Sequence, residues 1–412
     1  MVVTIRPIRD DELVAWFTTF GTAMYIWGSD PVGSAAARRE TMDLERTLGA
    51  FEDDTIVGTY RTFSTRLTVP GGGRLNVGAV TAVSVRPTHR RRGILTTMIT
   101  DDLRASADRA EVASILIAAE WPIYGRFGYG PATWQAQWSL RTRATTFLTP
   151  PLGRVEIVAP LVARSIVPTI YEAYARAQPG AIQRPDHRWD FDLGLAEFPG
   201  RPRWKGQIVI HRSVEGEPDG YAIFHGEENW VDMYPEHRII VDELHGATTE
   251  VEIDLWRHLA QMDLTAQIQA ETRREHEPMQ WVLADPRAAQ VKGRSDFLWL
   301  RLLDVERALG GRTYERDGDL VIEVLDRLGD RDGPAAGRYR LVSSAGAATC
   351  ARTTAEPDLS IEVRALSAAY LGGTSLLDAT RAGGAVEHRP GALRDAAALL
   401  RTAAEPWCST WF

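Results

Sequence analysis

The sequence of 412 residues contains only two cysteines, Cys350 and Cys408. They lie far apart and show none of the short spacings of metal-binding or redox-active cysteine pairs, which argues against a disulfide framework. So little cysteine suits a reducing compartment. No apolar run is long enough to span a bilayer, and the start MVVTIRPIRDDEL lacks the pattern of a signal peptide. These absences predict a cytoplasmic protein without a membrane partner.

The chain also lacks a positive net charge. Its formal charge is −8, so it has no overall basic field that would attract nucleic acid. A Walker phosphate loop, an HExxH zinc motif and the G-x-S-x-G turn of serine hydrolases are all missing, and the histidines are scattered. We therefore predict no nucleic-acid partner and no metal. The glycine-rich Gly125–Gly130 has dinucleotide-like spacing, but it does not open a helix after a strand, so we reject that interpretation.

The composition that remains is that of a globular protein, with 44% hydrophobic and 25% charged residues. A chain of this length predicts roughly two to four domains, because single cores rarely grow beyond about 250–300 residues. Apolar patterns along the chain predict strands and helices in alternation. The main examples are strands at Val2–Ile5 and Phe297–Leu302 and helices at Thr41–Leu48, Val251–Leu264 and Val305–Leu309.

The most informative stretch is residues 79–98, AVTAVSVRPTHRRRGILTTM. Ala79–Val85 is rich in valine, as strands are. Pro87 ends this pattern, because a proline biases the residue before it away from helix. From about Arg91 the apolar residues repeat at helical spacing. Further on, the apolar run Val112–Ile117 predicts a buried parallel strand, so the segment forms a right-handed βαβ unit.

Arg90–Gly93 lies between the first strand and the helix of this unit. The first N–H groups of a helix have no internal partner, and the helix dipole favours an anion beside them. Gly93 allows a ligand to approach the backbone closely. A run of arginines alone is more often a solvated basic turn. The flanking strand and helix favour a phosphate site instead.

The string from Arg90 to Leu95 resembles the Q/R-x-x-G-x-G/A signature of GNAT acetyltransferases, with Leu95 in place of the final Gly or Ala. Together with VSVRPTHRRRGIL, IYGRFGYGPAT and WLRLLDVERALGGRTY, it makes the sequence resemble the Eis family of actinobacterial aminoglycoside N-acetyltransferases. The resemblance implies an α/β and α+β protein with tandem GNAT domains and a sterol-carrier-protein-like C-terminal domain. We place these domains at 1–150, 151–290 and 291–412. The second GNAT domain is expected to be degenerate, because it shows no second RxxGxG/A.

The resemblance also implies an acetyl-CoA site, with the pyrophosphate at the arginine loop and the pantetheine arm between the two parallel strands. The residues predicted to bind acetyl-CoA are Val83, Ser84, Val85, Arg90, Arg91, Arg92, Gly93, Ile94, Leu95, Thr96, Ala119 and Glu120.

Two catalytic residues follow from the same resemblance. Tyr124, the first tyrosine of YGRFGYG, is the expected general acid, although a tyrosine in a glycine-rich loop is more often a packing residue. The α-carboxylate of Phe412 at the chain end is the expected general base. Chain termini are usually poorly ordered. Two aromatic residues at the end of a mobile tail would expose apolar surface, which favours a packed terminus here. Trp411 stands where the aminoglycoside-acetylating relative is acidic, which weakens the expectation of a polycationic acceptor.

The predicted function is direct transfer of acetyl from acetyl-CoA to an amine. The acceptor is a small polyamine-like molecule, an aminoglycoside or a lysine side chain. The resemblance alone implies a homo-oligomer, a hexamer built from two trimers. The alternative is a lipid or small-molecule binding protein that uses the sterol-carrier-like domain beside a non-catalytic GNAT module.

Overall fold

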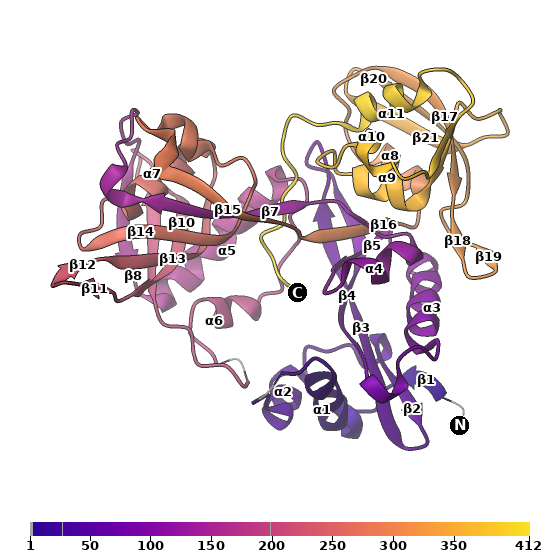
Figure 1. The fold of residues 1–412 in the computed structure, drawn as a ribbon, viewed down its shortest axis with the longest axis horizontal. Coiled ribbons are helices and arrows are strands. Elements are labelled where there is room, and N and C mark those ends of the chain that lie inside the picture. Colours follow the sequence, from indigo (N-terminus) through magenta and orange to yellow (C-terminus); the bar gives the residue numbers. More distant parts are fainter. Residues whose placement is uncertain (1–2, 27, 198) are drawn as a thin grey trace.

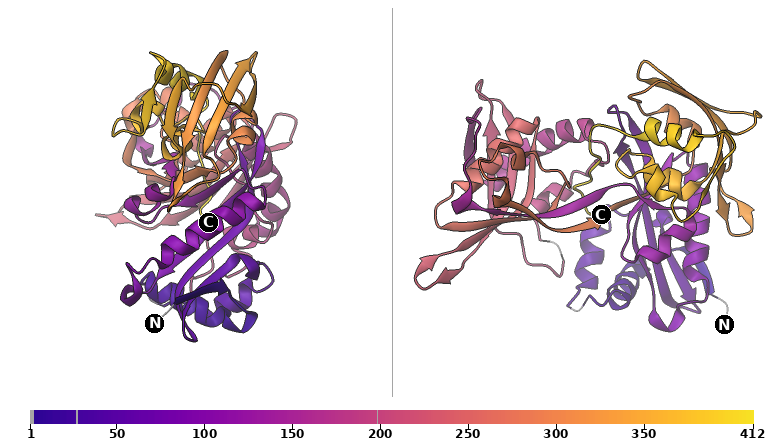
Figure 2. Two further views of the ribbon diagram at one scale, coloured as in Figure 1. Left: turned by 90° about the vertical axis from the view of Figure 1, so that its right-hand side faces the viewer. Right: turned by 45° about the horizontal axis from the view of Figure 1, so that its top comes forward.

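The computed structural model describes residues 3–26, 28–197 and 199–412, whose strands form three main sheets, one in each domain (Figure 1). The first domain lies at the lower right of Figure 1, the second at the left and the third at the upper right. The C-terminus lies between the first and second domains, as the views in Figure 2 also show. No helix of the described residues has the length and apolarity needed to cross a membrane.

The sheet of the first domain has the strand order β1-β2-β3-β4-β5-β16-β6. Its strands are β1 (Val3–Pro7), β2 (Thr47–Glu52), β3 (Thr55–Thr68), β4 (Arg74–Val85), β5 (Ala113–Ile117), β16 (Leu298–Leu302) and β6 (Gly130–Pro131). Its helices are α1 (Leu13–Ala23), α2 (Pro31–Arg38), α3 (Ile94–Asp108) and α4 (Trp121–Tyr124).

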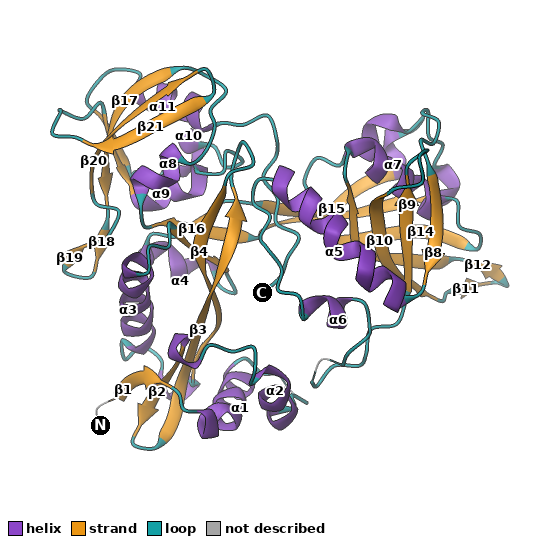
Figure 3. Ribbon diagram, turned by 180° about the vertical axis from the view of Figure 1, so that it is seen from behind, coloured by secondary structure: helices purple, strands orange, loops and turns teal. Residues whose placement is uncertain are grey.

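Helices cover both faces of this first sheet (Figure 3). Side chains alternate between the faces of a strand, so the neighbours Ile56 and Val57 on β3 serve different cores. Val57 packs in the cluster that contains Met98 of α3, whereas Ile56 packs with Trp16 of α1. Helices α1 and α2 therefore lie on one face of the sheet, while α3 covers the other face.

The sheet of the second domain has the order β15-β7-β14-β13-β10-β9-β8. Its strands are β15 (Ala289–Asp296), β7 (Trp134–Arg141), β14 (Thr265–Arg273), β13 (His237–Gly246), β10 (Pro218–Glu227), β9 (Gln207–Arg212) and β8 (Arg154–Val158). Its helices are α5 (Pro160–Ala177), α6 (Arg188–Asp192) and α7 (Thr249–Ala260), and a hairpin of β11 (Trp230–Val231) and β12 (Tyr234–Pro235) projects from its edge.

The third domain has a five-stranded sheet in the order β21-β20-β17-β22-β23. Its strands are β17 (Gly318–Leu325), β20 (Gly337–Ser344), β21 (Ala347–Arg352), β22 (Leu359–Glu362) and β23 (Ala385–Glu387), and a short hairpin joins β18 (Arg327–Leu328) to β19 (Arg331–Asp332). Its helices are α8 (Val305–Gly310), α9 (Val363–Ala369), α10 (Leu376–Ala379) and α11 (Ala392–Leu400).

The chain crosses between the first two sheets twice. Strand β7 belongs to the second sheet although it precedes residue 150, where we placed the end of the first domain. Strand β16 returns to the first sheet after residue 290, and it pairs antiparallel with β5 from Leu298 to Leu302. Strands β7 and β16 thus each pair in the sheet of a domain other than the one in which we placed their residues.

Most predicted elements of secondary structure are confirmed, but the helix at Thr41–Leu48 is wrong. Leu44–Arg46 forms a single 3-10 turn, and Thr47 already starts strand β2. β2 is held between β1 and β3, where Leu48 is the partner of both Pro7 and Tyr60. These partners outweigh the local helical pattern. The predicted first strand is β1, and its predicted first residue, Val2, lies outside the described residues.

Candidate active site

Strands β4 and β5 run parallel, but they pair only from Val77 to Val80, opposite Ala113 to Leu116. Strand β4 continues to Val85, so Thr81–Val85 do not pair with β5. A bulge lies at this point, because Ala82 has a φ of 51° and the pairing with β3 shifts register there. A bulge bends a strand and re-aims its backbone. The predicted separation of the two strands is thus present at Val83, Ser84 and Val85.

Thr59 of β3 fixes this bulge. Its hydroxyl donates a hydrogen bond to the Ala82 carbonyl oxygen at 2.8 Å and lies 2.8 Å from the Ser84 hydroxyl. Both Thr59 and Ser84 are buried. Beyond Val80 the backbone of β4 has no ladder partner in β5, although the Ala82 carbonyl oxygen accepts from Thr59 and the Val85 carbonyl oxygen accepts from Arg90 Nε at 3.5 Å. Neither Thr59 nor Ala82 was among our predicted site residues, since a bulge has no clear signal in one sequence.

The loop after β4 leads directly into helix α3. Gly93 caps the helix with a φ of 80°, and a Cβ added there would meet no atom within 4 Å. No side chain of the described residues caps the first N–H groups of α3, which are those of Ile94, Leu95 and Thr96. A helix N-terminus with free N–H groups and open space beside it is a good anion site. The predicted glycine and the first residues of the helix therefore lie together at one uncapped helix N-terminus.

The arginines of the loop are held by different partners. Arg92 donates a hydrogen bond to Glu52 at 2.9 Å, and His89 contacts the second carboxylate oxygen of Glu52 at 3.0 Å. Arg90 and Arg91 are both exposed, and Arg91 has a φ of 62°. The loop thus has three arginines directly before the helix N-terminus, of which Arg92 is paired with Glu52 and Arg90 donates a long hydrogen bond to the Val85 carbonyl oxygen.

Tyr124 lies at the end of α4, seven residues after β5 ends at Ile117, with the exposed bend at Ala119 and Glu120 between them. Its side chain is buried in the cluster that contains Val80 and Leu116. Burial, with a smaller effect of the Glu120 carboxylate, raises the pKa of Tyr124 to about 12. No described residue forms a hydrogen bond with the Tyr124 hydroxyl, so this donor is free for a ligand.

The neighbouring Tyr129 is different. Its hydroxyl lies 2.6 Å from the Ser114 hydroxyl in the core, and its ring packs edge-on against Tyr124 with centroids 6.1 Å apart. Burial raises the pKa of Tyr129 well above its ordinary value. Tyr129 is therefore a structural residue that supports the ring of Tyr124.

The third domain holds the loop that carries Tyr124. Arg301 of β16 is fully buried, donates to the Phe127 carbonyl oxygen at 3.1 Å, and forms an ion pair with Asp326 at 2.8 Å. A Cβ added to Gly130 would lie 2.6 Å from the Arg364 carbonyl oxygen of α9. The glycine-rich stretch thus permits close packing against the third domain, in agreement with our rejection of a dinucleotide site.

The C-terminal tail crosses the second domain before it reaches the first. Arg184, buried in the second domain, donates to the Thr410 hydroxyl at 2.8 Å, and the Tyr171 hydroxyl lies 2.9 Å from the same oxygen. Arg184 is itself held by Glu243 at 2.8 Å. Arg188 of α6 hydrogen-bonds the carbonyl oxygen of Trp411. The chain end is therefore fixed in place rather than frayed.

The last residue, Phe412, reaches the first sheet. Its ring packs edge-on against Phe63 of β3, with centroids 5.9 Å apart and an interplanar angle of 86°. Trp411 is mostly exposed, and its ring lies 5.8 Å from Phe297. The structure thus brings the predicted terminal residue to the β3–β4 region. The anchors Arg184 and Arg188 were missed, because nothing in their local sequence points to a partner more than two hundred residues away.

The second domain has a related pair of parallel strands, but their ends are occupied. β13 and β14 pair only as far as Val241 and Ala270. Beyond that point Trp407 of the tail lies 4.9 Å from the Arg273 guanidinium of β14 and 5.5 Å from the His245 ring of β13. Helix α7 follows β13 after two residues, and the Thr248 side chain caps it. The described part of this domain therefore has no counterpart of the arginine loop.

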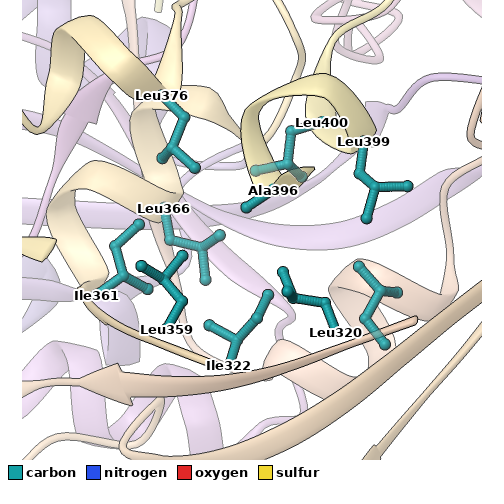
Figure 4. A pocket seen from close by; sticks show the side chains of 10 residues that line it. Leu320, Ile322, Leu359, Ile361, Leu366, Leu376, Ala396, Leu399 and Leu400 are labelled. Carbon is teal, nitrogen blue, oxygen red and sulfur yellow. The ribbon is translucent and has the colours of Figure 1, made fainter. Parts of the chain in front are cut away.

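A cavity in the third domain bears on the alternative of lipid binding (Figure 4). It lies between the sheet and helices α9, α10 and α11, and aliphatic side chains such as Leu320, Ile361 and Leu399 line it. Its volume is about 10 Å³, which is room for one water molecule at most. Ligand pockets typically have roughly 300–1,000 Å³. The structure thus does not favour the lipid-binding alternative.

Comparison with known proteins agrees with this architecture. Residues 4–132 and residues 180–302 each match a model described as an acetyltransferase (GNAT) domain, and residues 305–409 match a sterol carrier protein domain. The chain is 35% identical over 416 residues to an uncharacterized N-acetyltransferase of Streptomyces avermitilis, with 100% of this chain and 99% of that protein covered.

Two further relatives carry the family name. The chain is 33% identical over 388 residues to N-acetyltransferase Eis of Mycobacterium tuberculosis, which covers 90% of each protein. Its fold matches the crystal structure of Eis1 from Mycobacterium abscessus with a TM-score of 0.86 and 34% identity, over 99% of this chain and 100% of that one. GNAT acetyltransferases use acetyl-CoA, and by these matches over nearly its whole length the chain belongs to the Eis family of GNAT N-acetyltransferases.

Proposed function

We propose that the first domain binds acetyl-CoA between β4, β5 and the N-terminus of α3, and that it transfers the acetyl group to an amine. The observation that carries this proposal is that the β4–β5 pairing ends at Val80, on the same edge as the uncapped helix after Gly93. The free N–H groups of α3 and the arginines 90–92 suit the pyrophosphate. The backbone edge of Val83–Val85, which has no ladder partner in β5, suits the amides of the pantetheine arm, with the Val85 carbonyl oxygen in a long hydrogen bond to Arg90.

In this proposal the amine nitrogen attacks the thioester carbon and the carbon–sulfur bond breaks. The α-carboxylate of Phe412 accepts the proton that the amine loses. A free carboxylate has a pKa near 3.5, so it is a weak base in water. A buried position or a bridging water would make proton transfer effective. The anchoring of the tail by Arg184 and Arg188 supports this role, because a general base must be held within hydrogen-bond reach.

Tyr124 is proposed to act at the leaving sulfur. Its pKa of about 12 keeps the phenol protonated until it is needed. Full proton transfer to a thiolate with a pKa near 8.5 is then uphill by roughly 5 kcal/mol, since each pKa unit corresponds to about 1.36 kcal/mol. We therefore propose that Tyr124 donates a hydrogen bond to the sulfur as charge develops there. Such a donor stabilises the transition state without first giving up its proton.

The test of the proposed function is an acetyl-CoA consumption assay over a panel of amines, with calorimetric titration of acetyl-CoA beside it. The panel includes the acceptors expected from the resemblance, which are aminoglycosides, polyamines and a lysine peptide. Turnover with any amine, together with acetyl-CoA binding, supports the proposal. Absence of acetyl-CoA binding contradicts the proposal and favours the alternative of a lipid or small-molecule binding protein.

We also propose a cytoplasmic homo-oligomer, a hexamer of two trimers. Both cysteines are free thiols, which suits a reducing compartment. The β11–β12 hairpin projects from the second domain (Figure 1) and exposes Trp230, Met233 and Tyr234, with Met233 89% exposed. Exposed apolar clusters often mark protein contacts. Light scattering measures the mass directly, and a monomer would exclude the hexamer.

A further inference from the structure

An arginine on the first sheet lies near the chain end, and no described residue forms an ion pair with it. Arg61 follows the bulge region on β3 and pairs with Thr81 of β4. It lies two residues before Phe63 on the same strand face. Its guanidinium carbon is 5.4 Å from the centroid of the Phe63 ring, and the Phe63 ring in turn packs against the ring of Phe412. One aromatic ring therefore separates this charge from the proposed base.

The guanidinium of Arg61 is poorly satisfied. Its Nε atom is buried and has no hydrogen-bond partner, and no described residue forms an ion pair with this side chain. Burial, together with nearby Arg38, lowers the pKa of Arg61 to about 10. A buried cationic donor without a partner costs free energy. An anionic ligand would remove this cost.

More positive charge surrounds the same place. Burial, followed by the guanidinium groups of Arg61, Arg38 and Arg188, lowers the pKa of His187. Burial, followed by the guanidinium group of Arg201, lowers the pKa of Arg38. These side chains come from β3, from α2 and from the segment around α6, so both domains contribute to one cationic cluster on the face that carries α1 and α2. We call Arg38, Arg61, His187, Arg188 and Arg201 the arginine cluster.

The acidic groups near the arginine cluster already have partners, and one of these partners, Arg188, belongs to the cluster. Asp186 pairs with Arg164 at 2.7 Å, and Asp192 pairs with Arg188 at 2.9 Å and contacts Arg184 at 3.8 Å. Asp43 accepts the Glu45 backbone N–H at 3.1 Å. Asp43 raises the pKa of Arg61, and Asp186 raises the pKa of His187. In each case a larger number of cationic neighbours lowers the pKa of the same group. Positive charge therefore predominates at this point of a chain whose net charge is negative.

The segment after α6 of the second domain comes close to the start of α2. A Cβ added to Gly200, in the segment that follows α6, would lie 3.1 Å from the backbone nitrogen of Asp30, just before α2. The arginine cluster therefore draws on α2, β3 and the region of α6 near the place where the segment after α6 meets the start of α2. This is the side of the sheet from which the tail presents Phe412.

We propose that the acceptor is an amine that also carries a carboxylate or a phosphate, and that the arginine cluster binds this anionic group through Arg61. The inference rests on the proposed acetyl transfer, because it specifies the substrate of that same site. Guanidinium groups bind carboxylate and phosphate with paired, charge-assisted hydrogen bonds. A polycationic aminoglycoside would instead meet like charges at this place, which is unfavourable in a partly buried site.

A second explanation of Arg61 is that it balances the carboxylate of Phe412. No ion pair between that carboxylate and a Lys, Arg or His side chain occurs among the residues that the structure describes. The two explanations differ in what a substitution does. If Arg61 stabilises the carboxylate of Phe412, its substitution should lower kcat/KM equally for every acceptor. If Arg61 binds the acceptor, its substitution should lower kcat/KM only for the anionic acceptors.

The experiment compares matched acceptors. β-Alanine, propanolamine and propanediamine are short amines whose far ends are anionic, neutral and cationic, and phosphoethanolamine against ethanolamine tests a phosphate. We expect the anionic members to have kcat/KM values about tenfold or more above those of their neutral partners. Arg61→Glu should lower kcat/KM for the anionic members by about tenfold to a hundredfold, the usual effect of losing a charged hydrogen bond. It should leave propanolamine within about threefold.

Arg66→Glu is the matched control, because Arg66 is an exposed arginine of β3 outside the arginine cluster. It should leave all acceptors unchanged. A preference of the wild type for propanediamine, or an equal loss for all acceptors in Arg61→Glu, overturns the inference. Calorimetric titration of β-alanine and phosphoethanolamine in the presence of CoA needs no turnover. Binding that is lost in Arg61→Glu supports the inference even if no amine is acetylated, whereas absence of binding by wild type overturns it.

Discussion

The ring of Phe412 packs edge-on against the ring of Phe63, with centroids 5.9 Å apart. This contact joins the last residue of the chain to the middle of strand β3, which lies beside the bulged strand β4. Aromatic pairs of this geometry contribute about 0.5–1.5 kcal/mol beyond the burial of their surface. The contact therefore helps to fix the direction of the terminal carboxylate. The hydrogen bonds of Arg184 and Arg188 hold the two residues that precede it, Thr410 and Trp411.

Tyr124→Phe should lower kcat by roughly a hundredfold to ten-thousandfold, the usual contribution of a group that assists a leaving atom. Acetyl-CoA affinity and melting temperature should stay close to those of wild type, because the hydroxyl has no partner in the described part of the protein. Steady-state kinetics and calorimetry measure both. Tyr129→Phe is the control: it breaks the bond to Ser114 and should cost about 1–3 kcal/mol of stability with turnover retained. Near-normal kcat in Tyr124→Phe would remove Tyr124 from the mechanism.

The pH dependence of kcat provides a separate test of Tyr124. A phenol donates only while it is protonated, and a raised pKa extends this state to higher pH. With a pKa of about 12, Tyr124 should stay protonated across the whole working range. We expect kcat to rise as the base and the amine lose their protons and then to stay level up to about pH 10. A falling limb below that pH, in protein whose circular dichroism is unchanged, would contradict the assignment.

Arg91→Ala combined with Arg92→Ala should raise the KM for acetyl-CoA by about tenfold or more and change kcat little. Contacts to the pyrophosphate are remote from the reacting carbon, so they contribute equally to the ground and transition states. Arg104→Ala is a suitable control, since Arg104 lies further along α3 and has only a long contact of 3.8 Å to Asp101. A loss confined to kcat would show that the loop acts on the chemistry.

The sequence predicted those parts of the site that depend on local pattern. A strand, a break at Pro87 and an apolar helix face after Gly93 are all encoded within twenty residues, and the structure has them as β4, the loop and α3. The helix start in particular follows from a residue that tolerates a positive φ. Local apolar patterns likewise predicted most strands and helices of the third domain.

Features that depend on distant pairing were not predictable. Thr47–Glu52 became a strand because β1 and β3 lie on either side of it. The arginine cluster joins Arg38, Arg61 and Arg188 from three elements in two domains, and each of them looks like an ordinary surface arginine in the sequence. The anchoring of Thr410 by Arg184 likewise depends on how two domains are placed.

Asp326→Ala should lower the free energy of unfolding by about 3–5 kcal/mol, because it leaves the fully buried Arg301 without its counter-charge. The loop near Phe127 should loosen as well, since Arg301 also donates to the Phe127 carbonyl oxygen. Urea unfolding measures the change. Asp319→Ala removes an exposed partner of Arg340 and should cost less than about 1 kcal/mol. Similar effects of the two substitutions would argue against the buried pair as a link between the domains.

The role of Phe412 is tested by two changes of the chain end that separate its charge from its ring. Deletion of Phe412 removes both the carboxylate in its proper place and the contact with Phe63. Amidation of the terminus, made by ligation of a synthetic C-terminal peptide, removes the charge and keeps the ring. If the carboxylate is the base, both proteins should lose most acetyl transfer. The amidated protein should keep its melting temperature and its acetyl-CoA affinity, because Arg184 and Arg188 hold Thr410 and the Trp411 carbonyl rather than the carboxylate. If Phe412 only fills space, the amidated enzyme should be fully active, and that result would sink the general-base assignment while leaving the proposed acetyl-CoA site intact.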